Sequence, residues 1–440
     1  MKNKKWMAIL LGGIMAASLA APCSVSAAEK TTLTFWHAMG GTNGEVLQQI
    51  VDDFNASQDE IEIKAEYQGT YDDTITKLKA AMQSDSGLPD VCQMYDVGTK
   101  FMYDSGAVIP VEDKFESTGY DKSSVMDVIS SYYTVEGKQY AMPFNVSTPM
   151  LYYNKDVFEA AGLDPETPPT TYDEVLEDAK KIVESGAAPV GYSQAIYGWF
   201  FEQQLAGLGV TYGNNDNGRT EAVTAVDFDS NGGGLKVFDM WKKLYDSGYF
   251  EDYGTTTADT QTAFFSGQVG MIIESTAILK NAVDSSPFEV GTGYLPRIEQ
   301  NDEGGVIIGG GSLWLTDTGN ETNEDAAWKF IEYITTPDVQ AKWSMGTGYF
   351  AINEKAYETD DMKAYLEENP NFETAINQLK DSPVNCNTAG VLSGVQTEAR
   401  LTFNEIMPQV YDGKLTTQDA VDQLAASVNK AIENYNESIK

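Results

Sequence analysis

The sequence has 440 residues, of which 42% are hydrophobic, and its formal net charge is −37. A chain of this length is too long for one ordinary hydrophobic core, so we expect two domains. The acidity argues against nucleic acid as a partner, because binding it requires lysines and arginines to displace counterions from phosphates. An acidic surface suits an exported protein that must stay soluble.

The first 27 residues are typical of a secretory signal peptide. Lysines at positions 2, 4 and 5 precede an apolar run that ends near Ala21, and Val25 and Ala27 are small residues suited to cleavage after Ala27. Cys23 raises the alternative of a lipid-anchored protein, but Pro22 directly before it argues against lipidation. We therefore predict a soluble exported protein in the periplasm or at the extracellular face of the membrane.

The sequence contains few residues suited to nucleophilic catalysis or metal binding. His37 is the only histidine, so mechanisms that need two imidazoles are excluded and a Ser-His-Asp hydrolase would depend on His37. Cys92 and Cys386 alone cannot form a zinc site, and either one disulfide or two free thiols is consistent with their positions. We expect no cofactor and no metal. A carboxylate-based hydrolase stays open, because the chain has 66 acidic residues and catalytic pairs are recognised only in space.

Strand and helix patterns alternate in the first hundred residues of the mature chain. Residues 31–36, 60–67 and 91–95 are predicted strands, and apolar stripes at helical spacing lie between them. This order indicates a parallel sheet with helices on its faces. The ligand site of such a sheet lies beyond the carboxyl ends of its strands. The residues that follow these strands are therefore the candidates for function.

A second set of elements follows the extended segment 140–153. Thr171 and Glu174 form a capping box that predicts a helix, and residues 322–325 are predicted to cap another. A further strand within 304–314 is framed by glycines, which let backbone approach a ligand or a neighbouring strand. The last predicted helix follows Thr416 and Thr417.

Several segments, in order along the chain, resemble one protein family. They are LTFWHAM (33–39), YQGTY (67–71), MYDVG (94–98), PFNVSTPMLYYNK (143–155) and GTGY (346–349). The chain resembles the glycerol-3-phosphate-binding branch of the extracellular solute-binding proteins of bacterial ABC importers, a family that includes maltose-binding protein.

This resemblance implies an α/β fold of the type II periplasmic-binding-protein class, with two lobes, a hinge and a ligand cleft between the lobes. The implied division is 28–143 with 290–335 for lobe 1 and 144–289 with 336–440 for lobe 2. Crossings between the lobes are expected at 144–149, at 290–296 and near Thr335. The implied partner is a membrane ABC permease that reads the closed form of a monomeric receptor.

The resemblance also nominates ligand contacts. They are Tyr71, Asp96, Ser147, Ser275, Gly310, Tyr349 and Arg400. Arg400 is the candidate for the phosphate, because its planar guanidinium donates two parallel hydrogen bonds that match phosphate oxygens. Asp96 is expected to accept hydrogen bonds from glycerol hydroxyls. Trp36 and Trp199 are candidate walls for the carbon skeleton.

Two departures from the family pattern leave the ligand open. Asp96 stands where the glycerol-3-phosphate binders carry glutamate, and residues 195–197 lack an expected tryptophan. The first hypothesis is a receptor for glycerol 3-phosphate or a glycerophosphodiester. The second keeps the receptor role with a neutral mono- or oligosaccharide as ligand. The third is the secreted carboxylate-based hydrolase.

Overall fold

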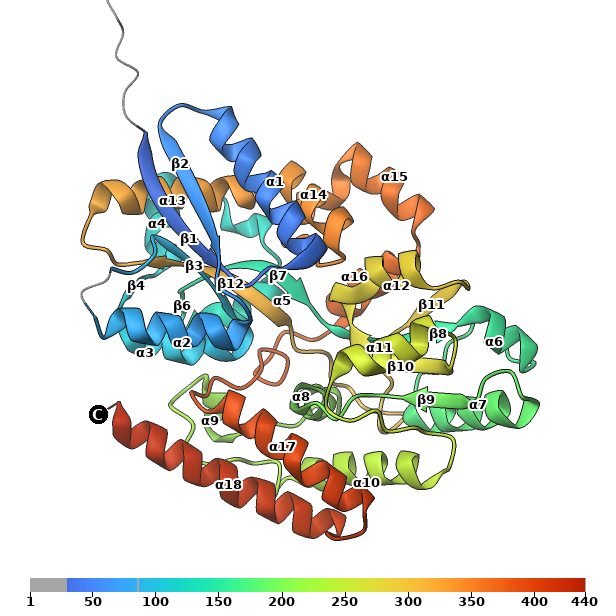
Figure 1. Ribbon diagram of the computed structural model, residues 1–440. Coiled ribbons are helices and arrows are strands. Elements are labelled where there is room, and N and C mark those ends of the chain that lie inside the picture. The colour runs from blue at the N-terminus through green and yellow to red at the C-terminus, as the bar shows by residue number, and fades with distance from the viewer. Residues whose placement is uncertain (1–29, 85–86, 440) are drawn as a thin grey trace, which may run out of the picture.

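The computed structural model describes residues 30–84 and 87–439. The predicted signal peptide and Cys23 lie outside the described residues. The fold contains two large β-sheets, which lie in different parts of the molecule, each with its own covering of helices (Figure 1). We call the part built on the first sheet lobe 1 and the part built on the second sheet lobe 2.

The sheet of lobe 1 has the strand order β2-β1-β3-β12-β4, and β7 also pairs with β12. The strands β1, β2 and β3 are mutually parallel where they pair, as the alternating pattern predicts, and β12 enters antiparallel. The bounds are β1 (Thr31–His37), β2 (Ile61–Tyr67), β3 (Val91–Tyr95), β4 (Val108–Ile109), β7 (Met142–Ser147) and β12 (Gly309–Thr316).

Helices cover the sheet of lobe 1 and connect its strands. The predicted stripe of the first helix is confirmed, because Leu47, Ile50, Val51 and Phe54 are buried. These elements are α1 (Gly41–Ser57), α2 (Tyr71–Met82), α3 (Thr99–Ser105), α4 (Val111–Thr118), α5 (Asp127–Ser130), α13 (Glu321–Ile334), α14 (Pro337–Thr347) and α15 (Asp360–Glu368), with a small hairpin of β5 (Thr134–Val135) and β6 (Lys138–Gln139).

The sheet of lobe 2 has the order β11-β8-β10-β9. Its strands are β8 (Pro149–Asn154), β9 (Val190–Ser193), β10 (Val269–Ser275) and β11 (Val290–Gly293). The helices that follow or cover these strands are α6 (Lys155–Ala160), α7 (Tyr172–Ser185), α8 (Gly198–Gly207), α9 (Asn214–Gly218), α10 (Gly233–Asp246), α11 (Thr257–Phe265), α12 (Leu279–Ser285), α16 (Asn371–Asp381), α17 (Gln396–Tyr411) and α18 (Thr417–Ser438).

Local capping signals set where several helices begin. Thr171 accepts from the backbone of Glu174 in the predicted capping box, and Thr416 caps α18. The cap of α13 is Asn320, whose side chain accepts from the backbone N–H of Asn323. The helix therefore starts one residue before the predicted cap region.

The chain leaves the sheet of lobe 1 after β7 and enters the sheet of lobe 2 at β8, with Thr148 between the two strands. The other crossings differ from the predicted boundaries. Strand β11, expected in lobe 1, pairs antiparallel with β8 in lobe 2, with Val290 opposite Asn154 and Gly293 opposite Leu151. Helix α14, expected in lobe 2, packs against α1 in lobe 1. We therefore propose that lobe 1 regains the chain at β12 and keeps it through α15.

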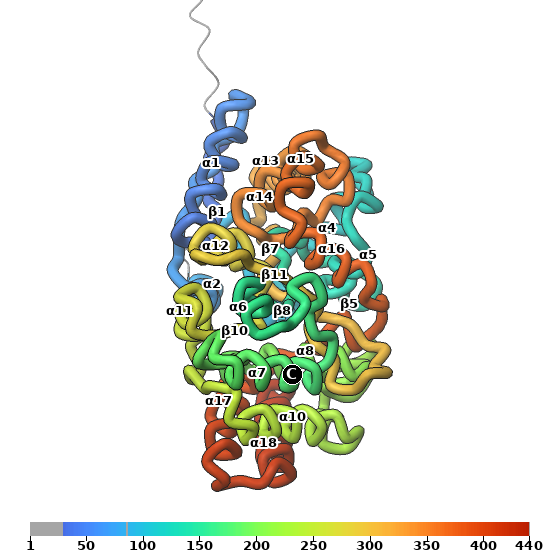
Figure 2. Tube along the Cα trace, turned by 90° about the vertical axis from the view of Figure 1, so that its right-hand side faces the viewer, coloured from blue at the N-terminus to red at the C-terminus, as the bar shows by residue number. Residues whose placement is uncertain are grey.

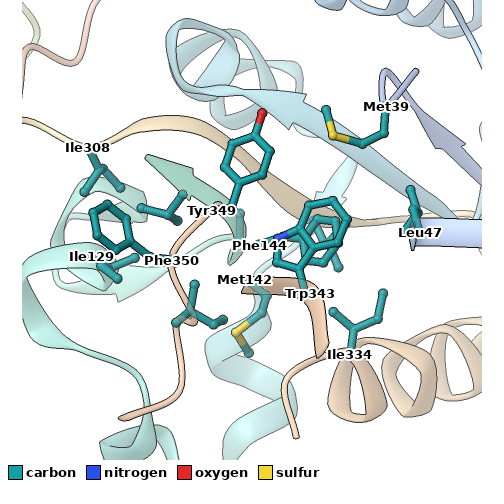
Figure 3. Packing of buried hydrophobic residues seen from close by; sticks show 14 of the residues in the cluster. Met39, Leu47, Ile129, Met142, Phe144, Ile308, Ile334, Trp343, Tyr349 and Phe350 are labelled. Atoms are coloured by element: carbon teal, nitrogen blue, oxygen red, sulfur yellow. The ribbon is translucent and has the colours of Figure 1, made fainter. Parts of the chain in front are cut away.

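Each lobe has a hydrophobic core. One cluster gathers side chains of the lobe 1 sheet with those of α13 and α14 and continues into lobe 2 at residues such as Phe264 and Ile272; Figure 3 shows the part around Trp343, Phe144 and Tyr349. The core of lobe 2 joins α7, α8, α10, α17 and α18 to its sheet. In Figure 2, α1 and α13 lie at one end of the molecule and α10 and α18 at the other.

Both described cysteines are free thiols, so the disulfide alternative for Cys92 and Cys386 does not apply to this structure. Cys92 is buried in β3, and burial raises the pKa of its thiol to about 12. Within 30–84 and 87–439, none of the helices combines the length and apolar character that crossing a membrane requires.

Candidate functional site

A buried cluster of three charged side chains joins the two lobes. Arg400 donates from Nε and Nη2 to the two oxygens of Glu202, each at 2.8 Å. The same Nη2 donates to Asp96 Oδ2 at 2.7 Å. Asp96 belongs to lobe 1, whereas Arg400 and Glu202 belong to lobe 2. All three residues are less than a tenth exposed, so the ion pairs lie away from solvent.

The positions of these charges follow from the elements that carry them. Asp96 comes directly after β3, at the carboxyl end where the sequence predicts ligand contacts. Arg400 lies on the buried face of α17 and Glu202 on α8. Gly198 lets these two helices approach closely, because a Cβ at this position would lie 2.5 Å from Arg400 Cα. This contact brings Glu202 within reach of the guanidinium.

Burial and charge act in opposite directions on this cluster. Burial alone would lower the pKa of Arg400, but the carboxylates of Asp96 and Glu202 outweigh it and hold that pKa well above its ordinary value. Burial raises the pKa of Glu202, although Arg400 counteracts part of the effect. Arg400 thus stays a cation, and the pKa of Glu202 stays above its ordinary value.

Tyrosine rings surround the cluster. The rings of Tyr132 and Tyr197 lie within electrostatic range of Asp96, Arg400 and Glu202, and burial raises the pKa of Tyr197 to about 12. Tyr197 precedes α8 and Tyr132 lies in lobe 1, so aromatic side chains from both lobes enclose the charges. Neutral aromatic rings beside a guanidinium make a site suited to an amphiphilic small molecule.

A polar network in lobe 1 contains two of the predicted contacts, Tyr71 and Tyr349. Asn145 donates to the hydroxyl of Tyr71 at 2.6 Å and accepts from Gln93 at 2.7 Å. The ring of Tyr71 stacks on that of Tyr95, with 5.1 Å between ring centres. Tyr349 belongs to the same network, because its hydroxyl influences the pKa of Tyr71.

The ring of Tyr349 is anchored in the lobe 1 core. It stacks on Trp343 with 5.6 Å between ring centres, and in Figure 3 its hydroxyl lies at the edge of the apolar cluster. Burial raises the pKa of Tyr349, so its hydroxyl remains protonated and available as a donor at neutral pH.

The glycine-rich start of β12 lies between this network and lobe 2. Gly310 has φ = +91°, and a Cβ there would lie 1.8 Å from the carbonyl oxygen of Asn145. Neither condition is compatible with a side chain. Glycine therefore allows β12 and β7 to approach each other beside the charged cluster.

Trp199 packs over Gly309, where a Cβ would lie 2.7 Å from Cζ2 of the indole. Gly309 is the strand partner of Ser147, so Trp199 and Ser147 lie on either side of the same backbone segment. The indole Nε1 of Trp199 is buried without a hydrogen-bond partner among the described residues. A buried donor of this kind is available to a ligand acceptor.

Two predicted residues have other contacts. Ser275 begins the turn after β10, and its Oγ accepts from the backbone N–H of Ala277. Trp36 donates its indole N–H to Glu66 on the neighbouring strand at 3.0 Å. None of the contacts found for Trp36 in the described part of the chain reaches Arg400 or Asp96. Its role as a ligand wall stays a prediction.

Glu202 and Asn145 are site residues that sequence reasoning missed. Glu202 stands in GWFFEQQLAG, where it follows three aromatic residues and lies three positions after Trp199. A charged residue on the same helical face as an expected ligand contact is a usable signal. Asn145 lies within the recognised FNVSTP segment, but an amide in a buried strand has no distinctive pattern.

The chemistry-bearing cluster is separate from a cavity of about 530 Å³. That cavity lies between the start of α7, the β11–β12 connection and the end of α16, and none of the predicted ligand contacts lines it. Its lining residues include three prolines and Arg297.

Two lobes, each with its own sheet, with ion pairs and aromatic side chains meeting at their junction, define a receptor of the bilobal solute-binding class. Residues 49–374 match the family model of bacterial extracellular solute-binding proteins, and the chain belongs to this family. Membership confirms the receptor prediction over the hydrolase, and it implies an exported protein that works with an ABC transporter.

Known relatives agree with this assignment. The chain is 31% identical over 417 residues to the sn-glycerol-3-phosphate-binding periplasmic protein UgpB of Escherichia coli (strain K12), covering 93% of this chain and 94% of the relative. The structure is similar to the cyclic alpha-maltosyl-1,6-maltose binding protein from Arthrobacter globiformis, with 27% identity, a TM-score of 0.76, and coverage of 92% and 100%.

A second solved structure confirms the fold. UgpB from Mycobacterium tuberculosis, solved in complex with glycerophosphocholine, matches with a TM-score of 0.78 and 20% identity, covering 92% of this chain and 99% of that one. The predicted α/β fold with two lobes is therefore correct.

Proposed function

We propose that the chain captures glycerol 3-phosphate or a glycerophosphodiester between its two lobes and delivers it to an ABC permease. The observation that carries this proposal is the position of Arg400. A buried guanidinium of lobe 2, held against Asp96 of lobe 1, is where an anionic ligand would contact both lobes. The 31% identity to a glycerol-3-phosphate-binding relative supports the same ligand class.

Each proposed contact has a chemical role. Arg400 would donate to phosphate oxygens, and the free Nε1 of Trp199 would donate a further hydrogen bond. Asp96 would accept from glycerol hydroxyls. The remaining proposed contacts are hydroxyl or backbone groups that can donate or accept, namely Tyr71, Ser147, Ser275, Gly310 and Tyr349, and Trp36 stays a proposed apolar wall.

Ligand binding would exchange partners in the buried cluster. A phosphate that reaches Arg400 competes with Asp96 for the same guanidinium, since Asp96 accepts from Nη2. Contacts from both lobes would then stabilise the closed arrangement that the permease recognises.

A neutral carbohydrate is the second candidate ligand. Arg400 is already paired with two carboxylates, and a guanidinium neutralised in this way can donate to sugar hydroxyls without needing an anion. Carboxylates and aromatic rings together also suit sugars, which present hydroxyls on their edges and C–H groups on their faces. The similarity to a maltosyl-maltose-binding protein agrees with this candidate.

We further propose the cellular setting. Residues 1–27 would direct export and be removed, leaving a monomeric receptor in the periplasm or at the extracellular face of the membrane. The net charge of −37 leaves nucleic acid without a role as partner.

Isothermal titration with glycerol 3-phosphate, glycerophosphocholine and maltose tests this function. We expect the wild-type protein to bind a phosphate ester, and Arg400→Ala to lose at least 100-fold in affinity, because a charge-assisted phosphate contact is removed. Arg297→Ala removes an exposed arginine in a segment that connects the lobes and serves as the matched control. Binding of maltose alone would favour the second candidate, and unchanged phosphate-ester affinity in Arg400→Ala would contradict the proposed phosphate role.

A further inference from the structure

Glu202 is a buried carboxylate that none of the proposed ligand roles uses. It receives two hydrogen bonds from Arg400 and a third from Gln396 Nε2 at 3.0 Å. Its carboxylate therefore covers one whole edge of the guanidinium. A ligand that approaches Arg400 must do so from another side.

The hydrogen-bonding capacity of Arg400 shows which side that is. A guanidinium has five N–H groups, and Nε and Nη2 contribute three. Nε and Nη2 point to Glu202 and Asp96, whereas Nη1 makes no hydrogen bond to any part of the chain that the structure describes. The Nη1 end is thus the free donor, and Asp96 is the partner that a ligand can displace without disturbing Glu202.

The charge of the cluster limits what can bind there. Arg400 with ionised Asp96 and Glu202 carries a net charge of about −1, in a region from which water is excluded. Like charges repel strongly in such a medium. A phosphomonoester brings a charge of about −1.5 to −2 at neutral pH, whereas a phosphodiester brings one. Each additional negative charge on the ligand is repelled by the carboxylate of Glu202, which is held in place by Arg400.

We propose that Glu202 is the specificity residue that makes this site prefer a singly charged phosphodiester to a doubly charged phosphomonoester. It acts through Arg400: its two hydrogen bonds hold the guanidinium in place, and its negative charge offsets part of the positive charge that a ligand would otherwise meet. This inference rests on the proposed function, because it concerns the ligand class of the same site.

Uptake of a proton by Glu202 when the ligand binds provides a second, independent test of this role. Burial raises the pKa of Glu202, and the groups that face it are Asp96 and Arg400, with the rings of Tyr132, Tyr197 and Tyr212 around them. Arg400 and the hydrogen bond from Gln396 both favour ionised Glu202, and an anion on Arg400 weakens the contribution of Arg400, so the pKa of Glu202 rises further. Binding is then accompanied by proton uptake, and affinity increases as the pH falls toward that pKa.

The test compares Glu202→Gln with the wild-type protein by isothermal titration at pH 7.5. The probes are glycerol 3-phosphate, glycerophosphocholine and maltose. We expect the wild-type protein to bind the diester at least 10-fold more tightly than the monoester. Glu202→Gln removes the charge with little change of shape, so monoester affinity should rise about 10-fold or more relative to the diester. Glu405→Gln removes an exposed carboxylate of α17 and should leave the ratio unchanged.

Proton uptake is measured with the diester near pH 6, in two buffers of different ionisation enthalpy. The diester has no group that titrates in this range, whereas the second pKa of a monoester is about 6. We expect uptake by the wild-type protein and none by Glu202→Gln. Equal uptake by both proteins, or an unchanged ratio of the two phosphate affinities, would overturn the assignment of Glu202.

An equal loss of affinity for all three ligands in Glu202→Gln would also overturn the assignment of Glu202, because this residue would then only support the structure. Thermal melting of both proteins identifies a folding defect, and Glu202→Asp, which restores the charge, should recover the preference for the diester. If neither protein bound any phosphate ester while both bound maltose, the proposed function would fail and this inference with it. If phosphate esters bind but their relative affinities do not change in Glu202→Gln, only the inference about Glu202 fails and the proposed function stands.

Discussion

At the scale of single residues, the cluster of Asp96, Arg400 and Glu202 is sensitive to the loss of one partner. Removing a member of a buried ion pair leaves an uncompensated charge in a low-dielectric region, which is far less favourable than the intact pair. The two carboxylates would lose the one cation that pairs with them within residues 30–84 and 87–439.

We therefore expect Arg400→Met to lower the free energy of unfolding by about 3 kcal/mol at pH 7. The variant leaves Glu202 buried without the Arg400 guanidinium, which raises the pKa of Glu202 in the folded state further above that in the unfolded chain. A carboxyl group of this kind favours folding as the pH falls, so the loss should be smaller at pH 5. Urea unfolding of both proteins at the two pH values measures this. An equal loss at both would contradict the proposed charge state.

Sequence reasoning located Arg400 and Asp96 but not Glu202, and the reason is physical. Asp96 follows a predicted strand, so its place at the sheet edge can be inferred locally. The contact between Glu202 and Arg400 joins residues 198 positions apart in the sequence, through the packing of α8 on α17. No local pattern specifies that packing.

At the scale of elements, hydrophobic periodicity predicted the parallel strands of lobe 1 and the helices between them. It could not predict that β12 inserts antiparallel between β3 and β4, because its partners come from distant segments. The same limit explains β11, which is too short to show a pattern and whose lobe is decided by pairing with β8. Glycines at the start of β12 were correctly identified as permitting close backbone approach.

Gly310 provides a test of that approach. Gly310→Ala would place a Cβ 1.8 Å from the carbonyl oxygen of Asn145, in a backbone conformation with positive φ. Gly319→Ala is the matched control, since Gly319 also has positive φ but nothing lies within 4 Å of its added Cβ. We expect Gly310→Ala to destabilise the protein by about 2 kcal/mol more than the control, measured by urea unfolding. Equal effects would mean that β12 can move away from β7.

At the scale of the whole molecule, several contacts besides Arg400 hold the lobes together. Arg219 of lobe 2 donates to the backbone carbonyl of Tyr132 in lobe 1 at 2.9 Å and lies over its ring. Tyr435, near the end of α18, donates to Asp104 of α3 at 2.7 Å. Figure 1 shows this end of α18 beside α2 and α3. The two lobes are therefore in direct contact at several points besides the charged cluster.

Tyr435→Phe tests whether a contact far from the ligand contributes to closure. The substitution removes one hydroxyl that donates to a carboxylate and keeps the ring that packs against Gly394. A hydrogen bond to a charged group contributes about 1.5–3 kcal/mol, so ligand affinity should fall about 10-fold if the bond forms only on closure. Isothermal titration measures the affinity. An unchanged value would show that the contact persists in the open form.

The most direct test of the whole account is a crystal structure of the protein with a bound glycerol phosphate ester. We expect the phosphate to lie between the lobes, with its oxygens within hydrogen-bond distance of the Arg400 guanidinium and Trp199 Nε1, and with Glu202 still bonded to the opposite edge of Arg400. A ligand phosphate bound elsewhere, with Arg400 still paired to both Asp96 and Glu202, would contradict it.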